Sequence, residues 1–108
     1  MLPLAKIADI PEGKAIKVEA CDREIAIFRK GNEFFATGAV CPHNSGPLHE
    51  GELSGWIVTC PWHGWQFDIR TGCGISGIGR VTRYPIEIQN GTVYLKNPES
   101  YDDVSRLL

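Results

Sequence analysis

The sequence predicts an all-β fold in which antiparallel strands surround an insert of different composition. Short stretches alternate apolar and polar residues and are rich in β-branched and aromatic side chains, which is typical of half-buried strands. Gly-Asn and Asn-Gly pairs separate two pairs of these stretches, as in tight hairpins. The middle of the chain is instead rich in glycine, proline and histidine, and there the alternation stops.

Three strands are predicted before the insert. They cover Ala15 to Ala20, Glu24 to Arg29, and Phe34 to Val40. Lys30-Gly31-Asn32-Glu33 links the second strand to the third, because a Gly-Asn pair tolerates the positive φ that tight turns require. These segments are therefore expected to form antiparallel neighbours.

The insert runs from Cys41 to about Gly79 and contains two short apolar runs, Trp56 to Thr59 and Trp65 to Ile69. Alternation resumes at Val81 to Ile88. Gln89-Asn90-Gly91-Thr92 then predicts a tight hairpin before a last strand, Val93 to Lys96. The segments outside the insert are expected to form one antiparallel sheet.

The C-terminal residues 101–108 are expected to form a short helix. Ser100, with Asp103 three residues later, resembles a capping box. One helical face would carry the apolar residues Tyr101, Val104, Leu107 and Leu108. This face is expected to pack on the domain, with docking of a partner as the alternative.

Composition and length are those of a single soluble domain. The chain has 108 residues, 43% of them hydrophobic and 22% charged, which is enough for one core. The net charge of -2, with no run of Lys or Arg, argues against nucleic acid as a partner. No apolar stretch approaches the roughly 20 residues of a membrane span, and Met1 to Asp9 show no secretory signal. We expect a cytoplasmic protein.

Two loops of the insert each contain one Cys and one His. The first is Cys41-Pro42-His43, and the second is Cys60-Pro61-Trp62-His63-Gly64. Proline and glycine allow sharp turns, so that both side chains of a loop can point at one small object. Without an export signal, metal ligation is favoured over disulfides.

The order of these ligands favours iron over zinc. Two thiolates and two imidazoles could hold a structural zinc ion, which is the alternative. Common zinc-finger spacings place a Cys pair before a His pair, whereas here each loop supplies one of each. A [2Fe-2S] cluster with His in place of Cys on one iron needs both thiolates on one metal and both imidazoles on the other. The predicted ligands are Cys41, His43, Cys60 and His63.

These motifs, with Gly51 and Gly72 around them, resemble the Rieske family over nearly the whole chain. Within that family the sequence is similar to the soluble ferredoxins that supply electrons to bacterial ring-hydroxylating oxygenases. The resemblance implies an antiparallel β-sandwich over residues 1–108, with a cluster-binding subdomain inserted at about residues 40–74. It also implies a monomeric one-electron carrier between a flavin-dependent ferredoxin reductase and a terminal oxygenase. The alternative is a small subunit of a larger oxidoreductase, such as an assimilatory nitrite reductase.

The resemblance implies no catalytic site in this chain. An oxygenase needs a further mononuclear iron held by two His and one carboxylate, and only His49 is left over. We therefore expect an electron-transfer component and not an enzyme.

Departures from the cytochrome bc branch of the family predict a low reduction potential. That branch has a disulfide across the cluster, but Gly46 and Trp62 stand at the matching positions here. It also has a Ser and a Tyr that donate hydrogen bonds to the cluster sulfurs, where this chain has Trp65 and Phe67. Such hydrogen bonds favour the reduced state, so their loss lowers the potential. We expect a value near the lower end of the Rieske range of about -150 to +300 mV.

Other notable residues are expected to have ordinary structural roles. His49 is expected in solvent on a loop surface, Cys21 as a small buried apolar residue, and Cys73 as an incidental thiol. Trp65 is expected to pack in the core, whereas Trp62 is expected near the surface and is the better docking candidate. Four charged residues are expected to be solvated, with steering of a partner as the alternative: Glu50, Glu52, Asp68 and Arg70.

Overall fold

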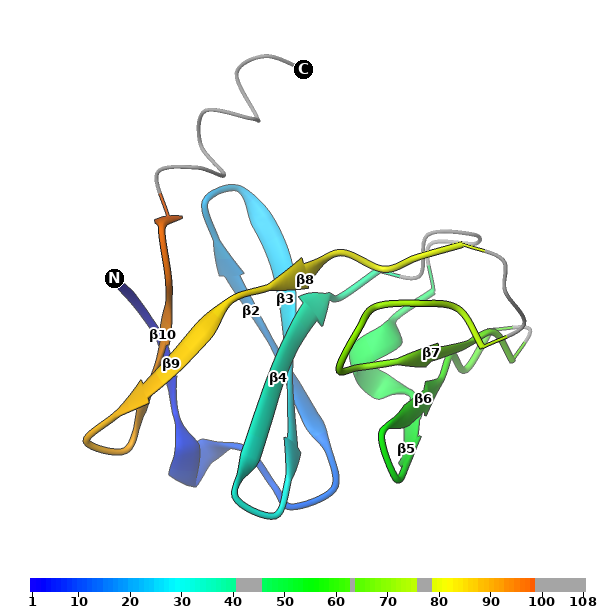
Figure 1. Cartoon of the computed structure of the whole chain (residues 1–108), viewed down its shortest axis with the longest axis horizontal. Helices are drawn as coiled ribbons and strands as arrows, with labels where there is room; N and C mark the ends of the chain where they lie inside the picture. The colour runs from blue at the N-terminus through cyan, green and yellow to red at the C-terminus, as the bar shows by residue number, and fades with distance from the viewer. Residues whose placement is uncertain (41–45, 63, 76–78, 99–108) are drawn as a thin grey trace.

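Antiparallel strands and two short 3-10 helices make up the described part of the chain, in agreement with the all-β prediction (Figure 1). The structure is a computed structural model, and it describes residues 1–40, 46–62, 64–75 and 79–98. The helix expected over residues 101–108 lies outside the described residues. Within them, no helix is both long enough and apolar enough to cross a membrane.

The first three predicted strands form a meander. β2 (Ala15–Ala20), β3 (Arg23–Lys30) and β4 (Glu33–Gly38) pair antiparallel in sequence order. Gly31 has a φ of +61° in the turn between β3 and β4, which confirms the predicted hairpin. The eight residues of β3 include a run of four buried side chains, because this strand lies in the middle of its sheet.

A second sheet combines the two ends of the described chain. β1 (Leu2–Lys6) pairs with β10 (Thr92–Leu95), which in turn pairs with β9 (Ile86–Gln89). Asn90 and Gly91, between β9 and β10, have φ values of +49° and +77°. Positive φ at both central residues is what an Asn-Gly hairpin turn requires, so this prediction is confirmed.

The expectation of one sheet outside the insert is wrong, because these segments divide into two. β8 (Arg83–Tyr84) pairs with β4 in the first sheet, whereas β9 belongs to the second. Pro85 separates them. Proline has no N–H to donate to a strand ladder, and its carbonyl oxygen accepts a hydrogen bond from the Lys96 N–H at 3.0 Å. The chain thus crosses from one sheet to the other at this residue.

The two sheets face each other across a buried core, which makes the expected sandwich. Apolar side chains from both sheets fill this core, and the 3-10 helix η1 (Ile7–Asp9) leads into it. Its buried members are Ile10, Ile25, Ile27, Ala36, Tyr84, Val93 and Leu95.

A third small sheet follows β4 in the sequence and precedes β8. It contains β5 (Glu52–Ser54), β6 (Ile57–Thr59) and β7 (Gln66–Asp68), and the 3-10 helix η2 (Leu48–Glu50) comes before it. Figure 1 shows this sheet at one side of the sandwich. A second buried cluster joins the two parts: Ala26, Phe28, Ala39, Leu48, Val58, Cys60, Phe67, Ile69 and Val81. The small sheet falls within the range predicted for the inserted subdomain.

Candidate metal centre

The loop that contains Cys41 and His43 is held at both of its ends. Val40 and Pro47 form an isolated antiparallel bridge across its base. The next residue, Leu48, has a fully buried side chain and begins η2. Cys41 and His43 themselves lie outside the described residues, so the structure gives the frame of this loop and not its ligands.

The second loop is closed by a backbone hydrogen bond. The Cys60 N–H donates to the Trp65 carbonyl oxygen at 2.7 Å, directly after β6. Gly64 has a φ of +72°, a backbone conformation that favours glycine. The Cys60 side chain is 1% exposed. His63 lies outside the described residues, so Cys60 is the predicted ligand whose position the structure gives.

Gly51 allows the segment that follows the first loop to lie against the strand that precedes the second loop. A Cβ at this position would lie 2.4 Å from the Thr59 carbonyl oxygen and 3.0 Å from Cγ2 of Val58. Real Cβ atoms do not approach a backbone oxygen that closely, so only glycine lets the end of η2 lie against β6. Because η2 follows the first loop and β6 precedes the second, this contact places the two loop bases side by side.

A third loop, for which the sequence predicted no role, begins and ends at Cys73 and Arg80, which form an antiparallel bridge. Gly72 precedes it with a φ of +81°, and a Cβ there would lie 2.4 Å from the Val81 carbonyl oxygen. The Val81 N–H donates to the Gly72 carbonyl oxygen at 2.8 Å. The high glycine content of residues 72–79 was the available signal, since close backbone approaches need it.

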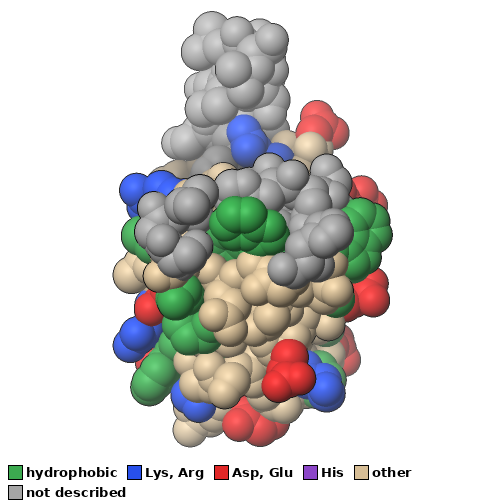
Figure 2. Space-filling view, turned by 90° about the vertical axis from the view of Figure 1, so that its right-hand side faces the viewer, with side chains coloured by type: hydrophobic (Ala, Val, Ile, Leu, Met, Phe, Trp, Pro, Cys, Tyr) green, Lys and Arg blue, Asp and Glu red, His purple; other side chains and the backbone are tan. Residues whose placement is uncertain are grey.

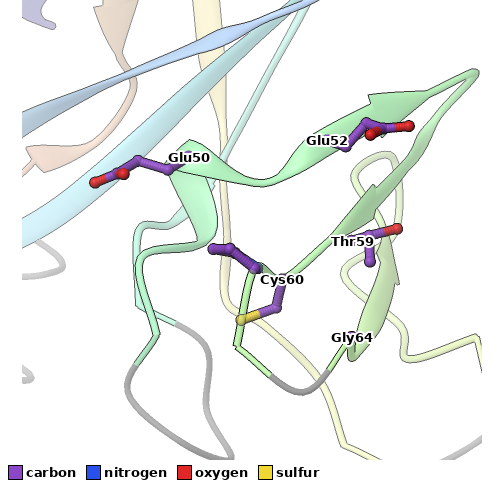
Figure 3. Close-up of a pocket in the computed structure, with 6 residues that line it drawn as sticks. Glu50, Glu52, Thr59, Cys60 and Gly64 are labelled. Carbon is purple, nitrogen blue, oxygen red and sulfur yellow. The ribbon is translucent and has the colours of Figure 1, made fainter.

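An open hollow of about 490 Å³ lies beside Cys60 (Figure 3). The carboxylates of Glu50 and Glu52 point outward on either side, away from the Cys60 sulfur. The full lining is Glu50, Glu52, Thr59, Cys60, Pro61 and Gly64. A buried thiol in the wall of a hollow is a soft sulfur ligand of the kind that iron–sulfur clusters use. The described part of the site therefore fits such a cluster.

The two tryptophans beside the second loop lie as the sequence predicted. Trp62 is 50% exposed, and Trp65 is partly buried against the apolar cluster that contains Cys60. Trp65 therefore contributes to packing, whereas half of the surface of Trp62 is exposed.

The expectation that His49 lies in solvent is wrong. Its side chain is only 18% exposed, because η2 packs against β2 and β3. Its Nε2 lies 3.6 Å from Oε2 of Glu50, and its buried Nδ1 has no hydrogen-bond partner among the described residues. Across the described residues, no three His, Cys, Asp or Glu side chains gather as a metal site, so His49 belongs to no second site there.

The two cysteines outside the motifs differ in burial. Cys21 is only partly buried, in contrast to the expectation, because it occupies the turn after β2 with a φ of +53°. Its thiol donates to the Pro98 carbonyl oxygen at 3.5 Å. Cys73 is exposed at the base of the third loop. Neither is close to a group of other possible metal ligands within the described residues.

Two of the charged residues that were expected to be merely solvated form a fork-like pair. The Arg70 guanidinium donates to both carboxylate oxygens of Asp68, at 3.1 and 2.9 Å, which lowers the pKa of Asp68. Arg70 also lies over the Trp56 ring, with 4.6 Å from Cζ to the ring centroid. Nζ of Lys30, at the end of β3, lies 5.1 Å from the same centroid. We call Lys30, Trp56 and Arg70 the Trp56 clamp, since it links the sandwich to the small sheet.

Comparison with known proteins identifies the family. The sequence model of the family described as the Rieske [2Fe-2S] domain matches residues 1–85. The chain belongs to the Rieske family. It is 34% identical over 94 residues to the ferredoxin component of the naphthalene 1,2-dioxygenase/salicylate 5-hydroxylase systems of Ralstonia sp., covering 85% of this chain and 90% of the relative. This Rieske chain therefore carries a [2Fe-2S] cluster of the Rieske type, as the sequence predicted.

Solved structures agree with this result. A ferredoxin solved in complex with the oxygenase of carbazole 1,9a-dioxygenase has a TM-score of 0.80 and 30% identity, covering 87% of this Rieske chain and 99% of the ferredoxin. A protein described as the small subunit of an NADPH nitrite reductase has a TM-score of 0.79 but 14% identity, which shows a common fold alone. The relatives are named as ferredoxin components, that is, as electron carriers and not as catalytic enzymes, which confirms the predicted electron-transfer role.

Proposed function

We propose that this chain is a cytoplasmic, monomeric one-electron carrier that takes electrons from a flavin-dependent ferredoxin reductase and gives them to a terminal oxygenase. One observation carries the proposal. The similar ferredoxin of the carbazole 1,9a-dioxygenase complex is covered over 99% of its length, so the match is to a complete carrier and not to one domain of a larger enzyme. We further propose that residues 1–108 form one domain whose cluster-binding part spans about residues 40–74.

We assign the cluster to the four ligands that the sequence pattern indicates. Cys41 and Cys60 supply thiolates to one iron, and His43 and His63 supply imidazoles to the other. The buried thiol of Cys60 and the closed bases of both loops support this assignment. These four residues would hold the cluster, which would supply the uptake and release of one electron at a time.

The ligand assignment is tested on protein purified aerobically. Equal amounts of iron and sulfide, with a rhombic low-g electron paramagnetic resonance signal after dithionite reduction, are the expected result. Cys41→Ser and His63→Ala should each abolish that signal. Cys73→Ser is the matched control and should keep it, because this exposed thiol is not an assigned ligand. A signal that survives either ligand substitution would show the assignment to be wrong.

We propose a potential near the lower end of the Rieske range. Trp65 and Phe67 have no hydroxyl group to offer the cluster sulfurs, and Phe67 is fully buried among apolar side chains. A low potential suits a carrier placed between a reduced flavin and an oxygenase. Protein-film voltammetry measures it, and a midpoint above about +100 mV would contradict this part of the proposal.

The alternative, a small subunit of a larger oxidoreductase such as a nitrite reductase, rests on the fold alone. Purification from the native host distinguishes the two. A free, folded protein that a flavin-dependent ferredoxin reductase reduces supports the carrier, whereas co-purification with a large sirohaem subunit supports the alternative.

A further inference from the structure

We propose that His49 is a proton-accepting residue linked to electron uptake: reduction of the protein favours the protonated imidazole, and protonation of this imidazole favours reduction. The chain has three histidines, and His43 and His63 are assigned as ligands, so His49 is the histidine left outside the ligand set. Imidazole is the side chain that most readily changes its charge between about pH 5 and pH 8. The inference rests on the proposed carrier function and adds a proton to its electron.

The short helix η2, which contains this histidine, lies between the frames of the two ligand loops. At its start, the Leu48 N–H donates to the Ala39 carbonyl oxygen at 2.9 Å, close to the base of the first loop. At its end, Gly51 lies against Thr59, which directly precedes Cys60. Leu48 and Cys60 also belong to the same buried apolar cluster. Packed protein therefore joins η2 to an assigned ligand, and charges interact more strongly through protein than through water.

The imidazole of His49 is mostly shielded from solvent. Its side chain is 18% exposed, and its Nδ1 is buried. Figure 2 shows the side of the molecule that carries the small sheet, where acidic side chains reach the surface but no surface of a described histidine is visible. Water and salt therefore screen a charge on this ring only weakly, so the ring should respond to a change of charge at the cluster site.

Two features of the surroundings act on the charge of His49 in opposite directions. The carboxylate of Glu50, with its Oε2 3.6 Å from Nε2, favours the charged imidazolium. Protonation is opposed at Nδ1, because a proton there would be a buried N–H without an acceptor among the described residues. A negative charge added at the cluster site has the same sign as the Glu50 carboxylate. Reduction should therefore favour the imidazolium.

Other charged side chains surround η2, but they are of types that do not titrate near neutral pH. They line a hollow together with His49, or they lie on the face of β2 and β3 against which η2 packs: Lys14, Lys17, Glu19, Glu24, Lys30, Glu50 and Glu52. Carboxyl and ammonium groups ordinarily titrate near about pH 4 and about pH 10.4. The hydrogen bond to Glu24 raises the pKa of Lys17 further. A pH dependence between these limits would therefore come from an imidazole.

The linked step moves one electron and one proton. The reductant supplies the electron, which reduces one ferric iron to ferrous iron. A buffer acid supplies the proton, so its own bond to hydrogen breaks and an N–H bond forms at the bare nitrogen of the neutral imidazole. A metal-bound imidazole has no bare nitrogen left, so His43 and His63 cannot accept this proton. Linkage is reciprocal: the proton raises the electron affinity by the factor by which the electron raises the proton affinity.

Protein-film voltammetry of the holoprotein from about pH 5.5 to pH 7.5 tests the inference. The unchanged protein should bind its electron about threefold more tightly at the acid end, which equals roughly 30 mV at about 59 mV per factor of ten. His49→Gln keeps a polar side chain that does not titrate, so its potential should stay constant over this range. The visible spectrum and the electron paramagnetic resonance signal of the variant should be unchanged, which shows that its ligands are in place.

Proton uptake measures the same link directly. On electrochemical reduction in weakly buffered solution near about pH 6.5, a pH indicator should report uptake of part of a proton by the unchanged protein and none by His49→Gln. Glu50→Gln should move the pH dependence to lower pH without abolishing it, because the carboxylate that favours the imidazolium is lost. Asp9→Asn removes an exposed carboxylate beside β1, on the second sheet, and is the matched control that should behave like the unchanged protein.

The outcomes separate the inference from the function on which it rests. A potential of the unchanged protein that is constant over this pH range overturns the inference, and so does a pH dependence that persists in His49→Gln. If His49→Gln loses its iron, as visible absorption would reveal, Glu50→Gln takes its place, and a pH dependence that does not move then overturns the inference. A protein without the rhombic low-g signal overturns the carrier function itself.

Discussion

The sandwich and the small inserted sheet are stabilised in different ways. β3 has eight residues and pairs along most of its length with both neighbours, whereas β5, β6 and β7 have three residues each. The small sheet depends on the close approach at Gly51, on the closed loops and on the Trp56 clamp. The sandwich therefore holds its shape by long strand pairing and its own core, whereas the insert combines three short strands with a few specific contacts and the buried cluster that it shares with β3.

Removal of the iron should produce the largest difference in stability between the sandwich and the insert. A group that binds only the folded insert stabilises it by mass action, so its loss should let the insert open while the sandwich persists. We expect backbone amides of β6 to exchange with solvent about 100-fold faster in the iron-free protein, which corresponds to roughly 2.7 kcal/mol. Amides of β3 should be nearly unchanged. Equal loss of protection in both strands, measured by hydrogen exchange, would contradict the comparison.

Gly51→Ala should have the next largest effect. Its Cβ would meet the Thr59 carbonyl oxygen at 2.4 Å, so η2 or β6 must shift, at a cost of about 2–3 kcal/mol of unfolding free energy. Gly38→Ala is the matched control, because its Cβ would lie 3.6 Å from Cγ2 of Val81, an ordinary contact. Chemical denaturation measures both. An equal loss of unfolding free energy in Gly51→Ala and Gly38→Ala would show that the close approach of η2 to β6 does not determine the effect.

Lys30→Met tests whether the clamp contributes to the attachment of the insert. Loss of the Lys30 cation above the Trp56 ring should lower the free energy of unfolding by about 0.5 kcal/mol. A double-mutant cycle with Trp56→Leu isolates the pair, since the cost should disappear in that background. Lys6→Met, at an exposed position of β1, is the control. A cost that survives in the Trp56→Leu protein would assign it to something other than the ring.

The smallest effect is expected from Asp68→Asn, and it should depend on pH. The Arg70 guanidinium lowers the pKa of Asp68 in the folded protein, so the pair stabilises the fold at a pH above the ordinary carboxyl pKa of about 3.9. This contribution is lost as the pH falls through the lowered folded pKa. Thermal melts should therefore show a higher Tm for the unchanged protein than for Asp68→Asn at pH 7, and this difference in Tm should narrow below about pH 4. A difference that stays constant down to pH 2 would contradict this explanation.

The sandwich strands were largely predictable because their signals are local. The alternation of apolar and polar residues predicted β2 with the bounds that the structure has, and the Asn-Gly pair predicted the hairpin between β9 and β10. The alternation pattern by itself missed the division into two sheets, which the family resemblance implied, although its cause, Pro85, is visible in the sequence. β1 was also missed, because its register shifts between Pro3 and Ala5 and its partner strand lies at the other end of the described chain. Such long-range pairing leaves little local pattern.

The insert was less predictable because its shape depends on contacts between distant residues. The ligand motifs were recognisable from the order of Cys and His, but the burial of His49 follows from how η2 packs against β2 and β3. β5 was missed because three residues are too few to show an alternation. The third loop carried no ligand motif, and only its glycines marked it.

The pairing of β4 with β8 has a consequence for protein engineering. The ladder joins Ala36 to Tyr84 and Thr37 to Arg83, so the chain leaves the sandwich and returns to it at adjacent points. A segment whose two ends are neighbours can be exchanged with little cost in loop-closure entropy. The insert is therefore a transplantable cassette, and replacing it with a short turn between β4 and β8 should leave a colourless scaffold able to accept cluster loops from other Rieske proteins.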